Sequence, residues 1–251
     1  MILKRVRRLL ACRLALFSSR GLALLECSTP LTSFSYTGAV PRETLIVFLP
    51  GIGDFAEDFE GRGFINALVQ SGLHADAIAV DAHYGYYARR NVLERLAEDV
   101  VLPARSQGYR QVWLVGISMG GMGALSYVMH HPGHIARVLL LAPYLGERAW
   151  IHEAIDAQDP TTPPPAEPDT RVHVQRVWRW IRDHHREQAV RPGLYLGYGS
   201  RDRFAKANAL FASHLPPRHV LTVGGGHDWR TWGRLWQAFL ALWTAETRTQ
   251  P

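Results

Sequence analysis

A serine follows a short apolar run in the pattern Gly-x-Ser-x-Gly. Residues 111–115 form the run, and Ser118 has glycine two positions away on either side, at Gly116 and Gly120. Glycine at those positions lets the backbone bend sharply enough to present the serine Oγ between a buried strand and a helix. Because the bare pattern arises by chance in roughly one such chain in ten, the surrounding residues carry the argument. The pattern predicts a nucleophilic serine on a strand-to-helix turn.

Two other residues, which come later in the chain, could activate this serine. A serine hydroxyl is a weak nucleophile at neutral pH, so it needs a base within hydrogen-bond reach and an acid that orients the base. Asp202 comes shortly after the apolar run 193–196, and His227 follows three glycines after the run 219–223. The carboxyl ends of parallel strands open on one side of a sheet, where residues distant in sequence can converge. We therefore predict that Ser118, Asp202 and His227 form a catalytic triad.

Other interpretations of the acid and the base remain open. Asp202 could instead cap the helix that follows it, and His227 could be an ordinary surface histidine. Asp228 is an alternative acid, but a residue adjacent to His227 is poorly placed to reach its Nδ1. Asp183 belongs to a different predicted helix.

The remaining histidines do not predict a metal site. Three of them surround Pro132 and cannot share one helical face, and two are adjacent and point in different directions. These residues are His130, His131, His134, His184 and His185. We predict neither a metal nor a cofactor.

Acyl transfer also needs backbone N–H groups that stabilise the oxyanion of the tetrahedral intermediate. The N–H of Met119, directly after the serine, is predicted to supply one of them. Residues 49–54 read Leu-Pro-Gly-Ile-Gly-Asp and should follow the first core strand. Ile52 is the first choice for the second donor and Gly53 the alternative. The same loop could be a plain tight turn, but it lacks the Gly-Lys-Ser/Thr ending of a phosphate-binding loop.

From residue 44 onward, short apolar runs alternate with longer amphipathic segments. Strands that are apolar along their whole length are typical of a parallel sheet covered by helices on both faces. The sequence predicts strands at 44–49, 77–80, 111–115, 135–142, 193–196 and 219–223, with a further edge strand at 31–37. It predicts helices at 64–70, 91–105, 119–130, 205–214 and 229–244. With 251 residues, 47% of them hydrophobic, the chain suits one α/β domain over residues 31–251.

The segment at about 147–191 interrupts this alternation. It contains a cluster of prolines and then an aromatic and basic stretch that is predicted to be helical. An insertion of this length could be a lid that shapes the substrate pocket, or a surface excursion. Tyr84, Tyr86 and Trp178 are predicted to line an apolar acyl pocket, with core packing as the alternative. The aromatic residues of the last helix recur every three or four positions, which favours core packing.

The first 25 residues carry six Lys and Arg side chains and no acid. Apolar residues recur there at spacings of three and four, which is typical of a basic amphipathic helix on an anionic membrane surface. Residues 1–30 are therefore predicted to be an N-terminal extension, either a targeting or membrane-contacting segment or a disordered one. The location is accordingly cytoplasmic or, with targeting, exported or membrane-associated. The apolar stretches are too short to span a membrane.

Charge and cysteine content restrict the partners. The net charge is +6, but the basic residues are spread along the chain without a nucleic-acid motif, so no nucleic-acid partner is predicted. Cys12 and Cys27 both lie in the N-terminal segment and do not describe a disulfide framework or a zinc site. The oligomeric state is not predicted.

The stretch 44–245 resembles the α/β-hydrolase superfamily, and within it the serine esterases. Four motifs carry the resemblance: LPGIGD, GISMGG, GYGSRD and GGGHDW. It implies an α/β-hydrolase fold, a triad of Ser118, Asp202 and His227, and a covalent acyl-enzyme. The oxyanion loop departs from the family by having Pro50 where many members have histidine, and the N-terminal strands look short. Serine at the turn argues against the dehalogenase branch, which has aspartate there.

Together these features predict a serine hydrolase that cleaves small carboxylic esters. Acyl transfer, or thioester or amide cleavage, on the same triad is the alternative. A non-catalytic binding protein that kept the fold is a third interpretation.

Overall fold

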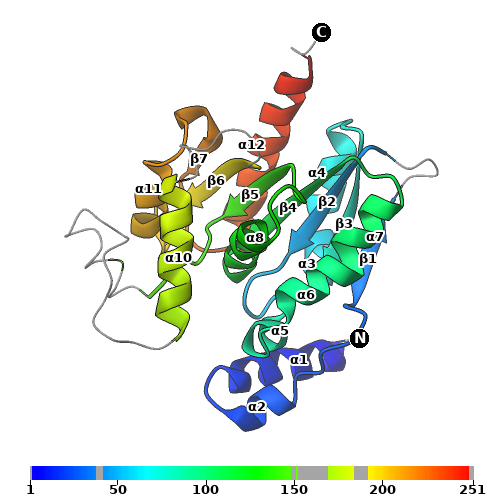
Figure 1. The fold of residues 1–251 in the computed structure, drawn as a ribbon, viewed down its shortest axis with the longest axis vertical. Helices are drawn as coiled ribbons and strands as arrows, with labels where there is room; N and C mark the ends of the chain where they lie inside the picture. Colours follow the sequence, from blue (N-terminus) through cyan, green and yellow to red (C-terminus); the bar gives the residue numbers. More distant parts are fainter. Residues whose placement is uncertain (1, 38–41, 148–150, 152–168, 184–191, 249–251) are drawn as a thin grey trace.

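A computed structural model of the chain describes residues 2–37, 42–147, 151, 169–183 and 192–248. Its centre is a seven-stranded sheet in the order β1-β3-β2-β4-β5-β6-β7 (Figure 1). β1 pairs antiparallel with β3, and every other pair is parallel. The predicted mostly parallel sheet flanked by helices is therefore confirmed.

The strands agree with the apolar runs, apart from their ends. They are β1 (Ser33–Tyr36), β2 (Thr44–Leu49), β3 (Ala75–Val80), β4 (Gln111–Ile117), β5 (Arg137–Leu141), β6 (Gly193–Gly199) and β7 (Val220–Val223). β4 and β6 continue past their predicted ends, through glycines that the sequence interpretation assigned to turns. The pairing explains this, because Gly116 matches Leu140 and Gly197 matches Leu141 in the neighbouring parallel ladders.

Helices cover both faces of the sheet. On one face lie α6 (Val92–Leu96), α7 (Leu102–Ser106), α8 (Met119–His130), α10 (Asp169–Asp183) and α11 (Ala205–Ala212). On the other lie α3 (Ala56–Gly61), α4 (Phe64–Gln70) and α12 (Trp229–Arg248). The predicted helix 91–105 contains a π-helical turn, Ala97–Val101, between α6 and α7. Alternate β2 residues enter the two cores, with Val47 on one face and Phe48 on the other.

The aromatic residues of α12 pack into the core, as predicted. Trp232, Trp236, Phe239 and Trp243 are buried in the cluster that also contains Phe64 of α4. Trp236 also donates from Nε1 to the Phe64 carbonyl oxygen at 3.0 Å. These contacts fix α12 against the sheet directly after the loop that carries His227.

The N-terminal segment forms α1 (Ile2–Ala15) and α2 (Ser19–Ala23), which lie beside α5 (Tyr84–Ala88) at one end of the molecule (Figure 1). Arg5 pairs with Asp58, and Arg8 pairs with Asp81. Burial raises the pKa of the Cys12 thiol to about 11. Among the residues described, no helix is both long and apolar enough to cross a membrane.

The structure describes only part of the predicted insertion at 147–191. The aromatic and basic stretch of the insertion forms the helix α10, as predicted. Four of its side chains are buried in the core: Val174, Val177, Trp178 and Ile181. His173 links α10 to α8 by a hydrogen bond of 2.8 Å between its Nε2 and the Ser126 Oγ. The stretches 148–150, 152–168 and 184–191 lie outside the described residues, so the lid stays a prediction.

Candidate functional site

Ser118 sits at the junction of β4 and α8 with a strained backbone. Its φ of 51° and ψ of −110° lie in a region that non-glycine residues rarely adopt. Hydrogen bonds to the main chain hold it there, because its N–H donates to Leu141 at 2.9 Å and its carbonyl accepts from Tyr144 at 2.9 Å. Ala142, the first residue after β5, is held to the neighbouring strand, because its N–H donates to the Gly197 carbonyl of β6 at 2.7 Å.

The two glycines of the pattern are needed for close backbone approach. A Cβ on Gly116 would overlap the carbonyl oxygen of Gly120. A Cβ on Gly120 would overlap the carbonyl oxygen of Leu49, at the end of β2. The turn can therefore place Ser118 against the neighbouring strand only when both positions lack a side chain.

Gly120→Ala is therefore expected to lower the free energy of unfolding by about 1–3 kcal/mol, the usual cost of overpacking. The clash is with backbone, which cannot rotate away as a flexible side chain can. Urea denaturation measures the effect. Gly233→Ala in α12 is the matched control, because its Cβ would meet nothing within 4 Å. The control should be neutral or more stable by roughly 0.5–1 kcal/mol. Equal losses in the two variants would contradict this explanation of the turn.

His227 lies between Ser118 and Asp202. Its Nε2 is 3.0 Å from the Ser118 Oγ, and its Nδ1 is 2.8 Å from Oδ2 and 3.0 Å from Oδ1 of Asp202. The Asp202 side chain is fully buried and that of His227 is 11% exposed. A carboxylate can only accept, so Nδ1 carries the proton and Nε2 is left to accept from the serine hydroxyl. The structure thus brings the three residues together in one hydrogen-bonded chain.

The loops that carry the acid and the histidine are packed against each other. The N–H of Arg201 donates to Gly225 at 2.8 Å, and that of Ser200 donates to Val223 at 2.9 Å. A Cβ on Gly199 would overlap the Gly225 carbonyl oxygen. Asp202 also accepts from the N–H of Phe204, close to the capping role considered as its alternative. The two loops therefore hold the acid and the base as one unit.

Two aromatic rings that the sequence interpretation missed enclose the His227 ring. Phe204 and Trp232 each lie edge to face with it, with ring centroids 5.0 Å away. Such contacts restrict the rotation of the imidazole. Phe204 follows Asp202 by two residues and Trp232 lies in the first turns of α12, but only the packing of the two loops shows that both reach the histidine.

The alternative acids have other contacts. Asp228 accepts from the Thr231 N–H at 2.9 Å, and this backbone hydrogen bond is the main reason why the pKa of Asp228 is lowered. Asp183 pairs with its neighbour Arg182 at 3.0 Å. In the described part of the chain, no three His, Cys, Asp or Glu side chains are grouped so that they could hold a metal ion.

The loop after β2 lies against Ser118. A Cβ on Gly51 would be 3.5 Å from the Ser118 Cβ, and the Asp54 N–H donates to Gly51 at 3.2 Å, which closes a tight turn. Gly53 has φ of 80°, so the turn requires its glycine. Within the described residues, the N–H groups of Met119, Ile52 and Gly53 donate to no carbonyl. This is the state that an oxyanion-binding N–H needs, but the choice of Ile52 or Gly53 stays a prediction.

Asp54 is a half-buried acid at this turn that the sequence interpretation did not single out. It accepts from the indole Nε1 of Trp229 at 3.0 Å. Burial raises the pKa of its carboxyl, and the hydrogen bond from Trp229 opposes that shift. The indole therefore links the turn after β2 to the first residue of α12, two residues beyond His227.

The residues predicted to bind substrate lie mainly in packed regions. Tyr86 is 1% exposed, and its hydroxyl donates to the Ser28 carbonyl oxygen at 3.1 Å. Trp178 is fully buried and donates from Nε1 to Leu145 at 3.0 Å. Tyr84 is half-buried against the cluster formed by α1 and Phe55. Core packing, the alternative considered for these residues, accounts for Tyr86 and Trp178.

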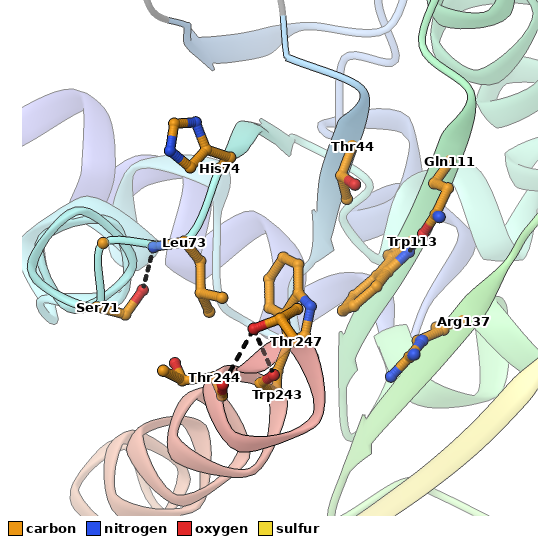
Figure 2. A pocket seen from close by; sticks show the side chains of 11 residues that line it. Thr44, Ser71, Leu73, His74, Gln111, Trp113, Arg137, Trp243, Thr244 and Thr247 are labelled. Atoms are coloured by element: carbon orange, nitrogen blue, oxygen red, sulfur yellow. Dashed lines mark hydrogen bonds between the residues drawn. The ribbon is translucent and has the colours of Figure 1, made fainter. Parts of the chain in front are cut away.

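A pocket of about 470 Å³ lies at the amino-terminal ends of the parallel strands, away from Ser118. Figure 2 shows the residues that line it. Its lining includes Thr44, Gln111 and Arg137, the first residues of β2, β4 and β5, whereas Ser118 follows the last residue of β4. The pocket also includes Trp113 and Trp243, whose ring centroids are 4.1 Å apart. It is therefore separate from the candidate site.

Comparisons with known proteins agree with this fold. The profile of a family described as alpha/beta hydrolase fold matches residues 44–167. The structure of S-formylglutathione hydrolase FrmB from Staphylococcus aureus is 14% identical with a TM-score of 0.56, over 85% of this chain and 95% of that one. Est1E from Butyrivibrio proteoclasticus is 17% identical with a TM-score of 0.56, over 88% and 95%.

A monoacylglycerol lipase from Paleococcus ferrophilus is 15% identical, with a TM-score of 0.53 over 86% of this chain and 98% of that one. No curated protein sequence matches the chain significantly. At these identities the solved structures establish the fold alone, and they agree with the family profile and with the observed sheet. The chain has the alpha/beta hydrolase fold.

Proposed function

We propose that the protein is a serine hydrolase that cleaves carboxylic esters through Ser118, His227 and Asp202. One observation carries the proposal: the hydrogen-bonded chain from the Ser118 Oγ through the His227 ring to the Asp202 carboxylate, with heavy-atom distances of 3.0 Å and 2.8 Å. Nucleophile, base and orienting acid stand in the order that acyl transfer requires. Structures with the same fold carry the names S-formylglutathione hydrolase and monoacylglycerol lipase, which supports hydrolysis as the reaction class.

In the proposed mechanism, His227 removes the Ser118 proton through Nε2 as the Oγ attacks the ester carbonyl carbon. The N–H groups of Met119 and of Ile52 or Gly53 stabilise the oxyanion. The histidine then gives its proton to the leaving alcohol, and an acyl-enzyme remains. Water, deprotonated by the same nitrogen, attacks the acyl carbon and releases the acid and Ser118. Asp202 stabilises the imidazolium that forms in each half-reaction.

Labelling with a fluorophosphonate tests the proposal directly. The wild type is expected to gain the mass of one phosphonyl adduct, because the probe reacts with an activated serine. Ser118→Ala should gain none. Ser200→Ala is the matched control, since Ser200 is exposed and lies in the Asp202 loop, and it should label like the wild type. An adduct on Ser118→Ala, or no adduct on folded wild type, would contradict the proposal. A p-nitrophenyl ester series then separates acyl chain lengths.

A further inference from the structure

The N-terminal helix exposes an apolar stripe. Val6, Leu10, Leu14 and Phe17 recur every three or four residues, so they share one side of α1 and its end. Their exposed fractions are 44%, 54%, 52% and 89%. In the described part of the chain, six of the nine exposed large apolar side chains lie between residues 6 and 24, the other two of the six being Leu16 and Leu24. A concentration of this kind marks an interaction surface.

The opposite side of α1 is fixed to the rest of the protein. Arg5 pairs with Asp58, while Arg8 pairs with Asp81 and, at 3.2 Å, with Glu57. The same side buries Ala11, Cys12 and Ala15 in a cluster with Leu25 and Phe55. These contacts determine the rotation of the helix about its axis, so the apolar stripe faces outward.

Exposed basic side chains border the stripe. Arg7 and Arg13 lie on α1 and Arg20 on α2, and all three are exposed. Within the described residues, none of them forms an ion pair with an acid. No acid occurs before Glu26. An apolar stripe with arginine along its borders is the composition of helices that lie in the interface of anionic membranes.

We propose that the outer face of α1, together with the turn into α2, binds the surface of an anionic lipid membrane. The apolar side chains enter the boundary between headgroups and acyl chains, and the arginines remain at the headgroup phosphates. The positive charge of this face favours an anionic membrane as its partner over a second copy of the chain. A symmetric contact between two copies would bring the same basic residues together, with no acid on the face to offset them.

The position of α1 relates this surface to the candidate site. Arg8 stacks over the Phe55 ring at 3.8 Å and pairs with Asp81. Phe55 follows the turn after β2 and Asp81 follows β3, so both lie at the carboxyl edge of the sheet, where Ser118 also lies. A membrane bound to α1 would therefore approach the molecule from the edge that carries Ser118. The binding itself requires no catalytic activity.

Vesicle co-sedimentation of the full chain tests this surface. Binding is expected with an equimolar mixture of phosphatidylcholine and phosphatidylglycerol, and should be about tenfold weaker or more with phosphatidylcholine alone. The variant Leu10→Ser/Leu14→Ser/Phe17→Ser should lose about tenfold or more in affinity for the mixture. Arg7→Gln/Arg13→Gln should lose on the order of tenfold and show a smaller dependence on salt. Ser118→Ala should bind like the wild type, which separates this test from that of the proposed function.

The matched control is Val69→Ser/Leu102→Ser, which removes exposed apolar side chains from α4 and α7. It should bind vesicles like the wild type, and circular dichroism should show that all variants keep the fold. Absence of binding to the anionic vesicles would overturn the proposal. So would an equal loss in the control. Size-exclusion chromatography that shows an oligomer converted to monomer by the Leu10, Leu14 and Phe17 changes, without vesicle binding, would instead assign the face to contact between copies.

Discussion

Ser118→Ala is expected to lower kcat for a p-nitrophenyl ester by on the order of 10⁶, the scale found when the serine of a protease triad is removed. Without the Oγ there is no acyl-enzyme, and only binding and the oxyanion donors assist attack by water. The free energy of unfolding should change by about 1 kcal/mol or less, because one hydrogen bond is lost and alanine keeps the same backbone at residue 118. Steady-state kinetics and urea denaturation measure the two quantities.

The double variant Ser118→Ala/His227→Ala sharpens this prediction. If the residues act as a unit, the double variant should be no slower than Ser118→Ala alone, since a base without its nucleophile has nothing to activate. Multiplied losses would mean that His227 assists the reaction independently of Ser118. Turnover of Ser118→Ala at the wild-type rate would exclude Ser118 as the nucleophile.

Asp202→Asn should reduce kcat by about 10⁴, as the equivalent change does in a serine protease. The Asp202 carboxylate is fully buried and accepts from Nδ1 of His227. An amide can present N–H to that nitrogen, which stabilises the tautomer with the proton on Nε2. His227 then has no lone pair for the Ser118 hydroxyl. The kcat of the purified variant, with its melting temperature, measures the effect.

Asp228→Asn is the control for this change. Asp228 is adjacent to His227, but it caps the start of α12 through the Thr231 N–H. Asparagine is also a good capping residue, so both kcat and stability should stay close to wild type. If Asp228→Asn were the inactive variant and Asp202→Asn the active one, the acid that orients His227 would be Asp228 and the assignment of Asp202 would be wrong.

The sequence predicted the parts of the fold that depend on local pattern. The apolar run before Gly116 and the glycines around Ser118 were enough to predict a strand, a turn and a helix, and β2 and α4 have their predicted bounds. The predicted end of β4 was two residues too early. Glycine is usual in turns, so the strand was expected to stop before Gly116, but the pairing with β5 continues through Gly116. The sequence around β4 carries no information about its pairing with β5.

The parts that escaped prediction depend on contacts distant in sequence. For Tyr86 the sequence left a pocket lining and core packing as alternatives, and it could not show that the hydroxyl donates to Ser28, 58 positions away. Phe204 approaches His227 from the Asp202 loop, and Trp232 approaches it from α12. The ion pairs of Arg8 with Glu57 and Asp81 determine which side of α1 faces outward. In each case the sequence shows the residue type, but the residue that it contacts depends on the folded chain.

The direct pairing of β5 with β6 fixes the spacing between the strands that lead toward Ser118 and Asp202. Arg137 to Leu141 match Gly193 to Gly197 in a continuous parallel register. Within the connection between these two strands, the Tyr144 N–H holds the Ser118 carbonyl and α10 buries Trp178 in the core. A change of this connection that keeps both contacts should leave Ser118 in place relative to the loops of Asp202 and His227. A connection grafted here from another protein of the same fold would therefore have to reproduce these two contacts, and it would then leave the set of reacting groups unchanged.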